Sequence, residues 1–235
     1  MKPRGLSGAL ARCLRRTPLH PQWLLEEDNV APELLRCRGV VLDIGAADRW
    51  TEPRFAAGAR YLALDYPATG SALYNARPDV FADGRRLPLG DSSVDGVLCL
   101  EVLEHVDGAE QVLAEIARVL VPGGVAMLSM PFLYPVHDAP HDFQRWTAHG
   151  WECRLAACGL RIERIEARGH SLRTAAMLTA MAIAGPVAAA RHGGWLAPFA
   201  LPVVALVNLA GWLGAWMWPR WPAMAQGHVV VATRR

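Results

Sequence analysis

The stretch VVLDIG at residues 40–45 decides the fold, because it is a continuous apolar run that stops at a glycine. Continuous apolar runs are typical of parallel strands that are buried on both faces, and a glycine after the strand permits a tight turn. Four comparable runs follow it: RYLALD at 60–65, DVFA at 79–82, VDGVLCL at 94–100 and GVAMLSM at 124–130. The sequence therefore predicts a sheet of mainly parallel strands.

Helical patterns lie between and after these strands. Residues 109–120 place apolar side chains at the spacing of one helix face, and residues 147–158 form a second expected helix that ends at Gly159. The alternating stretch 160–167 and the run HVVVA at 228–232 predict two more strands. Strands that alternate with helices indicate an α/β fold whose sheet is covered on both faces.

Composition and charge narrow the function classes. The 235 residues are 52% hydrophobic and 20% charged, with a net charge of +2. Residues 1–25 and 151–235 are basic, whereas residues 26–150 are strongly acidic. An acidic middle argues against nucleic acid as the main partner, and basic ends beside apolar sequence suggest a negatively charged membrane surface. Five cysteines without a CxxC pair, and no signal-peptide pattern, indicate a reduced, cytoplasmic chain.

Acidic and small residues follow the expected strands at their carboxyl ends, where open α/β sheets bind ligands. Asp43 and Gly45 close the first strand, Asp65 the second, Asp83 the third and Glu101 the fourth. An acid about 20 residues after the first strand commonly accepts hydrogen bonds from ribose hydroxyls, which fits Asp65. We therefore expect a nucleoside-binding site at this end of the sheet.

Four motifs resemble, in order and spacing, those of class I S-adenosylmethionine-dependent methyltransferases: VLDIGAADR, YLALD, ADGRRLPLGDSSVDGVLCLEVLEHV and EIARVLVPGGVAMLSMPF. The resemblance covers about residues 38–170 and the final strand. It implies a Rossmann-like methyltransferase fold, with a seven-stranded sheet whose last strand is antiparallel. It also implies S-adenosyl-L-methionine as the cofactor.

The resemblance implies the cofactor-binding residues one by one. Gly45 and Ala46 would lie under the methionine part, and Asp65 would hold the ribose. The others in the expected site are Asp43, Asp83 and the Gly84 backbone near the adenine, and Leu100 and Glu101 near the methyl group.

The first loop departs from the family pattern D-x-G-x-G-x-G. Ala47 and Arg49 stand where the second and third glycines are usual. Alanine fits if its φ is negative, and Arg49 suggests a short or displaced following helix. A Rossmann-like domain that has lost its cofactor is the alternative interpretation.

The segment 131–147 is expected to overhang the pocket. His137 and His141 are the candidate general bases, because histidine accepts protons near neutral pH. Asp142 and Arg145 are expected to pair and hold the loop. No metal is expected, since no third ligand lies near the two histidines in the sequence. The segment also resembles a methyltransferase subgroup loosely connected with cell-envelope glycan or lipid pathways.

A long apolar insertion does not fit a soluble sheet protein. Residues 174–190 and 192–219 carry no charge, and five of the nine tryptophans lie at 195, 212, 216, 218 and 221. We expect Pro186, Pro198 and Pro202 to interrupt its helices. The preferred interpretation is a helical hairpin that dips into, or lies on, the cytoplasmic leaflet of a membrane. A two-pass hairpin, a homodimer interface and a lid over a greasy substrate are the alternatives.

The sequence thus predicts a basic helical segment at 1–37, with a helix at 4–16, and a methyltransferase domain at 38–171 and 227–235. The hydrophobic insertion takes up 172–226. The predicted activity is methyl transfer to a lipid-linked, glycan or otherwise apolar acceptor at the inner face of the membrane. A soluble small-molecule methyltransferase and a non-catalytic membrane-tethered scaffold are the alternatives. The sequence leaves the oligomeric state open.

Overall fold

A computed structural model describes residues 13–26, 29–55, 58–70, 76–190 and 193–235. The predicted helix at 4–16 lies largely outside these residues. The described residues divide into two compact units, one comprising 13–26, 133–135, 167–190 and 193–227, the other the remaining described residues.

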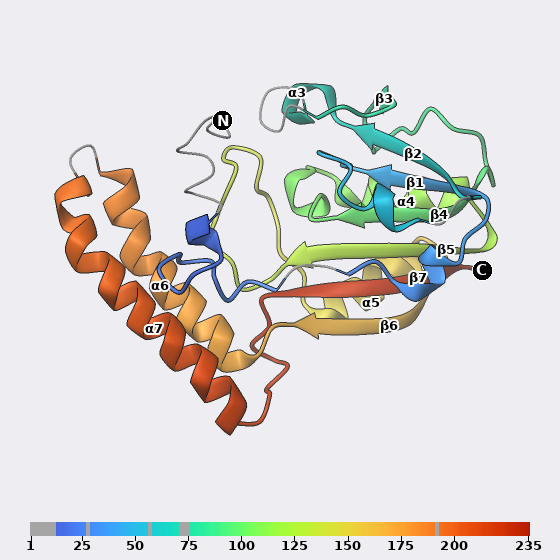
Figure 1. The fold of residues 1–235 in the computed structure, drawn as a ribbon. Helices are drawn as coiled ribbons and strands as arrows, with labels where there is room; N and C mark the ends of the chain where they lie inside the picture. The colour runs from blue at the N-terminus through green and yellow to red at the C-terminus, as the bar shows by residue number, and fades with distance from the viewer. Residues whose placement is uncertain (1–12, 27–28, 56–57, 71–75, 191–192) are drawn as a thin grey trace. The chain divides into compact units, whose positions relative to one another are not determined.

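The larger unit is built on a seven-stranded sheet with the strand order β3-β2-β1-β4-β5-β7-β6. Figure 1 shows β7 running against its neighbours β5 and β6, and the strands from β3 to β5 pair in parallel. The α/β fold and the antiparallel last strand are therefore confirmed. The strands are β1 (Val40–Ile44), β2 (Arg60–Asp65), β3 (Val80–Phe81), β4 (Val94–Leu100), β5 (Leu120–Pro131), β6 (Leu160–Arg168) and β7 (Gly227–Arg234).

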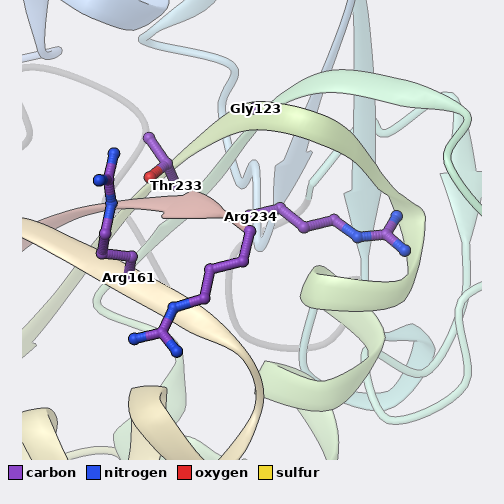
Figure 2. Close-up of a pocket in the computed structure, with 5 residues that line it drawn as sticks. Gly123, Arg161, Thr233 and Arg234 are labelled. Atoms are coloured by element: carbon purple, nitrogen blue, oxygen red, sulfur yellow. The ribbon is translucent and has the colours of Figure 1, made fainter.

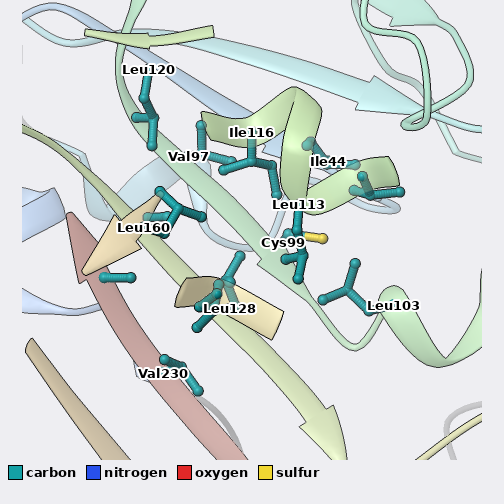
Figure 3. Packing of buried hydrophobic residues seen from close by; sticks show 14 of the residues in the cluster. Ile44, Val97, Cys99, Leu103, Leu113, Ile116, Leu120, Leu128, Leu160 and Val230 are labelled. Atoms are coloured by element: carbon teal, nitrogen blue, oxygen red, sulfur yellow. The ribbon is translucent and has the colours of Figure 1, made fainter. Parts of the chain in front are cut away.

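Alternate residues of the central strands face opposite sides of the sheet, and both sides are buried. Leu42, Val97 and Leu128 belong to the larger cluster, shown in Figure 3, while Val41 and Leu98 belong to a second cluster. Helices α4 (Ala109–Val119) and α5 (Ala148–Ala157) contribute to the first, and α2 (Pro32–Leu35) to the second. This two-sided burial explains the unbroken apolar runs in the sequence.

Beside the buried Ala109, helix α4 contributes four larger side chains to the larger cluster, all fully buried: Val112, Leu113, Ile116 and Val119. Their spacing matches one helix face, as predicted. Burying each such side chain stabilises the fold by about 1.5–3 kcal/mol. Helix α5 begins where Thr147 accepts a hydrogen bond from the Gly150 amide at 3.1 Å, which is an N-cap.

The smaller unit contains an antiparallel pair of long helices, α6 (Ser171–Ala189) and α7 (Ala197–Met217), joined through the 3-10 helix η4 (Gly193–Leu196). The prediction that Pro186 and Pro202 interrupt these helices is wrong, because both lie inside them. Each proline sits within two turns of a helix end, so few backbone hydrogen bonds are lost. Pro198 occupies the first turn of α7, where its missing N–H costs nothing.

Small and polar residues hold the hairpin together. The buried face of α7 consists of Val204, Asn208 and Gly211. The Asn208 amide donates to the carbonyls of Pro18 and His20 at 2.7 and 2.9 Å, so this polar side chain ties the N-terminal segment to the helix. At Gly211 the backbones of α6 and α7 approach closely, since a Cβ there would lie 2.3 Å from the Ala176 Cβ.

Replacing Gly211 with alanine is therefore expected to destabilise the smaller unit by about 1–3 kcal/mol, because the helices must separate. The matched control is Gly185→Ala in α6, where an added Cβ meets nothing within 4 Å. That change is expected to stabilise the helix by up to about 1 kcal/mol. Urea unfolding followed by tryptophan fluorescence measures both, since five of the nine tryptophans lie at 195–221. Equal stability of the two variants would contradict the close crossing.

Candidate functional site

The strand register brings the predicted residues to one end of the sheet. Ile44 pairs with Leu64 and with Cys99, so Gly45, Asp65 and Leu100 follow at the same level. Asp65 in turn pairs with Phe81 of β3. Because parallel strands end together, the residues after β1, β2, β3 and β4 gather at the carboxyl end of the sheet.

Asp65 is buried and held by backbone amides. Its carboxylate accepts hydrogen bonds from the amides of Ala47 at 2.9 Å and Tyr66 at 2.8 Å, and the residue is only 5% exposed. Burial raises the pKa of Asp65 above its usual range, and the two amides act in the opposite direction. The side chain thus ties the loop after β1 to the end of β2.

The loop after β1 adopts left-handed backbone at three positions. Gly45 has a φ of 76°, Ala47 of 45° and Arg49 of 59°. The condition under which alanine was expected to fit, a negative φ at Ala47, is therefore not met. Ala47 and Arg49 adopt the left-handed backbone that glycine favours. A Cβ at Gly45 would lie 2.3 Å from the Val102 Cγ2, so this position requires glycine on steric grounds as well.

Arg49 is held in its strained conformation by ion pairs. Its guanidinium contacts Glu52 at 2.8 Å and Asp79 at 2.9 Å. The element that follows is only a 3-10 helix, η1 (Glu52–Arg54), so the prediction of a short helix agrees with the described residues. These contacts offset the cost of left-handed backbone at a residue with a side chain.

Asp43 is buried within β1 rather than exposed at its tip. Its carboxylate accepts hydrogen bonds from the Thr51 hydroxyl at 2.7 Å and from the Tyr61 hydroxyl. Burial raises its pKa to about 6, against the effect of these two donors. Asp43 therefore anchors the loop after β1 through Thr51. Its direct contact with a cofactor stays a prediction.

Asp83 and Gly84 follow β3. The Asp83 carboxylate pairs with Arg85 at 2.7 Å, and this ion pair lowers its pKa. With about a third of its side chain exposed, Asp83 remains accessible to a ligand. Gly84 lies close to Ile44 and Val112, since a Cβ there would come within 3.6 Å of both.

Glu101 closes β4 in left-handed backbone, with a φ of 55°. The Ser129 hydroxyl donates to its carboxylate at 2.9 Å, and the Glu101 amide donates to Ser129 at 3.1 Å. This reciprocal pair links the ends of β4 and β5. Leu100, the preceding residue, pairs with Ser129 in the sheet register.

The loop after β5 places His137 beside a carboxylate. Its Nδ1 lies 3.2 Å from the Asp142 carboxylate, which also accepts from the Arg145 guanidinium at 2.8 Å. The predicted pairing of Asp142 with Arg145 is thus confirmed, and it lowers the pKa of Asp142 to about 2. His141 is exposed, and its carbonyl oxygen accepts a hydrogen bond from the His105 ring.

One cluster escaped the sequence analysis. Ligand atoms of Glu104, His105 and His137 lie within 4.8 Å of one another. Glu104 and His105 belong to the turn after β4, 32 residues or more before His137 in the chain. The prediction that no third ligand lies near His137 rested only on residues of the loop that contains His137. The EH dipeptide after β4 was the available signal.

The cavity shown in Figure 2 lies at the opposite end of the sheet. Its volume is about 460 Å³, and Gly123, Arg161, Thr233, Arg234 and Arg235 line it. These residues begin β5 and β6 and end β7, so they are remote from the carboxyl ends of β1 and β4. The Arg234 guanidinium donates to the Ser92 hydroxyl at 2.8 Å, which links the end of β7 to the turn before β4.

Comparison with known proteins identifies a methyltransferase domain in the chain. A family model for the methyltransferase domain matches residues 42–128, from β1 to β5. An "Uncharacterized methyltransferase" of Mycobacterium avium is 41% identical over 98 residues, which cover 38% of each chain. A Mycolicibacterium smegmatis protein named "Probable S-adenosylmethionine-dependent methyltransferase" is 38% identical over 116 residues, 46% of this chain and 45% of its own.

Residues 42–128 of this chain therefore form a methyltransferase domain, as the resemblance to S-adenosylmethionine-dependent methyltransferases implied. The aligned part of this chain spans less than half of the length of each of these curated relatives. Among solved structures, a SAM-dependent methyltransferase from Archaeoglobus fulgidus aligns with a TM-score of 0.54 at 16% identity, over 98% of this chain and 96% of its own. The (4+2)-cyclase SpnF aligns equally well, with a TM-score of 0.54 at 18% identity over 89% and 84%. These structural likenesses show the fold alone.

The left-handed backbone at Ala47 predicts how a glycine there would change the free energy of unfolding of this chain. Ala47→Gly is expected to raise the free energy of unfolding by about 0.5–1 kcal/mol, because glycine removes the steric cost of a positive φ. Thermal unfolding of the purified chain measures it. Ala46→Gly is the control: Ala46 is buried and has no positive φ, so glycine there is expected to destabilise. If both variants lose stability, the left-handed loop is contradicted.

Proposed function

We propose that this methyltransferase transfers the methyl group of S-adenosylmethionine to an apolar acceptor, lipid-linked or glycan-bearing, at the cytoplasmic face of a membrane. The family supports the reaction class and the cofactor. The exposed apolar surface of the α6–α7 hairpin supports the membrane and the nature of the acceptor.

The residues at the carboxyl end of the sheet fit the cofactor. Asp65 and Asp83 supply acceptor oxygens for the ribose hydroxyls and the adenine amino group. Gly45 and Ala46 follow β1 at this same end of the sheet and would lie under the methionine part of the cofactor. Leu100 and Glu101 would line the methyl end. When bound, S-adenosylmethionine supplies a methyl carbon made electrophilic by its sulfonium.

An oxygen acceptor must lose its proton, and this chain offers two candidate bases. His137 is the better oriented, since Asp142 fixes its Nδ1 and leaves the other ring nitrogen as the proton acceptor. His141, four residues later, is exposed on the same loop. Both histidines stay candidates for contact with the acceptor.

The outer face of α7 is apolar along its whole length. Phe199, Leu206, Leu213 and Met217 are spaced at helical intervals and are 54–84% exposed. The apolar windows of α6 and α7 are only 22% and 17% buried, which a soluble core helix would exceed. Such a surface needs an apolar environment to cover it.

Aromatic and basic residues mark the two ends of the hairpin. Trp195 precedes α7, and Trp216 and Trp218 stand at its end, all at least 67% exposed. Tryptophan favours the boundary between lipid and water. The His170 ring contacts the Trp218 carbonyl at 2.9 Å, so the start of α6 and the end of α7 lie together, with Arg173 and Arg220 close by in sequence. This arrangement suits a hairpin entered from the cytoplasmic side.

Membrane contact predicts a specific loss in vesicle binding. The double variant Leu206→Glu, Leu213→Glu is expected to bind vesicles at least tenfold more weakly, because each leucine contributes about 1.5–3 kcal/mol on burial. Co-sedimentation with phosphatidylglycerol-containing vesicles measures it. Val80→Glu, at a comparably apolar exposed position of β3, is the control and is expected to bind as the unaltered chain does. Equal binding by all three proteins would exclude hairpin insertion.

Cofactor binding predicts that Asp65→Asn weakens the affinity for S-adenosylmethionine at least tenfold, about 1.4 kcal/mol, because a charged ribose contact is lost. Calorimetry on the purified chain measures it. Asp95→Asn is the matched control, since Asp95 also accepts a backbone amide, that of Val40 at 2.7 Å, but at the other end of the sheet. Unchanged affinity in folded Asp65→Asn would remove Asp65 from the site.

The acceptor is tested with the same variants. The full chain is incubated with methyl-labelled cofactor and membranes, and label is expected in the lipid fraction with the unaltered protein and not with Asp65→Asn. Label in the aqueous small-molecule fraction instead would replace the proposed acceptor with a soluble one. Cofactor binding without any transfer of label would favour the non-catalytic scaffold.

A further inference from the structure

Two loops of the larger unit meet at a cluster of metal-binding side chains. Glu104 and His105 lie in the 3-10 helix η3 (Leu103–His105) after β4, and His137 lies in the loop after β5. Backbone contacts hold the loops together: the Phe143 amide donates to the Glu104 carbonyl at 2.8 Å. Leu103, fully buried in the core of Figure 3, anchors the turn. The three side chains are therefore held in place by the fold.

Glu104 is the unexplained member of this cluster. Its side chain is fully buried, and neither carboxylate oxygen has a hydrogen-bond partner among the described residues. The Nε2 of the His105 ring lies 3.6 Å from the Glu104 Oε1, which is beyond hydrogen-bond distance. A buried carboxylate without a partner is costly, and bound cations are among the few groups that offset this cost.

Each imidazole has its Nδ1 occupied by an acceptor. The His105 Nδ1 contacts the carbonyl oxygen of His141, and carbonyls only accept, so the proton is on that nitrogen. The His137 Nδ1 lies 3.2 Å from the Asp142 carboxylate, closer than the 3.5 Å to Arg145, which places its proton likewise. Both rings therefore offer Nε2 as a ligand atom. Metal-binding histidines are usually oriented in this way, by a carbonyl or carboxylate on the far nitrogen.

We propose that Glu104, His105 and His137 bind a divalent transition-metal ion. Two imidazoles and one carboxylate form a ligand set suited to Zn²⁺, Mn²⁺, Fe²⁺ or Co²⁺. Bonds of about 2.0–2.2 Å would place the ligand atoms about 3–3.5 Å from one another, and these atoms already lie within 4.8 Å of one another. Three protein ligands leave positions open for an exogenous oxygen.

The ion deepens the proposed function, on which this part of the inference rests. The cluster follows β4 directly, three residues after Glu101, which is expected near the methyl group. An acceptor with a hydroxyl or carboxylate oxygen would occupy an open coordination position and be oriented there, with its oxygen made more acidic. His137 then acts as a ligand, and the role of proton acceptor passes to His141.

The test uses the full chain, freed of metal with a chelator and titrated with Co²⁺ under reducing conditions. Binding of one Co²⁺ per chain is expected, with visible absorption typical of nitrogen and oxygen ligands and without the thiolate charge-transfer bands that the five cysteines would give. Glu104→Gln and His137→Asn are each expected to weaken binding at least tenfold. His149→Asn is the matched control, because His149 pairs with Glu152 at 3.0 Å but is 91% exposed and outside the cluster.

The outcomes separate this inference from the proposed function. Absence of Co²⁺ binding, thiolate bands, or equal affinity in Glu104→Gln, His137→Asn and His149→Asn would overturn the metal site, whatever the transferase activity. Loss of binding in the two cluster variants alone would support it, even if no methyl transfer were found. Label transfer that is lost with the chelator and restored by Co²⁺ would support the acceptor's binding to the ion. Transfer undiminished by the chelator would overturn that role.

Discussion

The pairing of β1 with β2 on one side and β4 on the other is the constraint on which the site depends. Because Ile44 is level with both Leu64 and Cys99, the chain leaves all three strands at one height. Three separate turns then meet at the same end of the sheet. A register slip of one residue in β2 would turn the Asp65 side chain to the other face of the sheet, away from the loop after β1.

Three buried carboxylates differ in how the chain meets the cost of their desolvation. Asp43 accepts from two hydroxyl groups and still has its pKa raised to about 6. Asp65 accepts from two backbone amides and so joins neighbouring turns. Glu104 is also fully buried, and neither of its carboxylate oxygens has a hydrogen-bond partner among the described residues. It is the carboxylate for which we propose a metal ion as the partner.

The hairpin carries apolar side chains on both of its faces. Its inner face combines small residues, such as Ala176 and Gly211, with the buried Met177 and Val204 and the polar Asn208. Close approach of helices at small residues, as at Gly211, is common among helices that lie in lipid. The outer face of α7 exposes large apolar side chains, and this exposed surface is the observation from which we propose membrane contact.

The sequence by itself determined the strands, the main helices, the order of the fold and the positions of Asp65, Asp83 and Glu101 at one end of the sheet, because hydrophobic periodicity and turn residues act locally. It also indicated the pairing of Asp142 with Arg145, three residues apart. Only the tertiary structure decided that Asp43 faces Thr51 and Tyr61, that Ala47 is left-handed and that α6 and α7 continue through their prolines. Only it joined Glu104 and His105 to His137. Contacts between residues distant in the chain depend on how packed elements meet, and no local pattern carries that information.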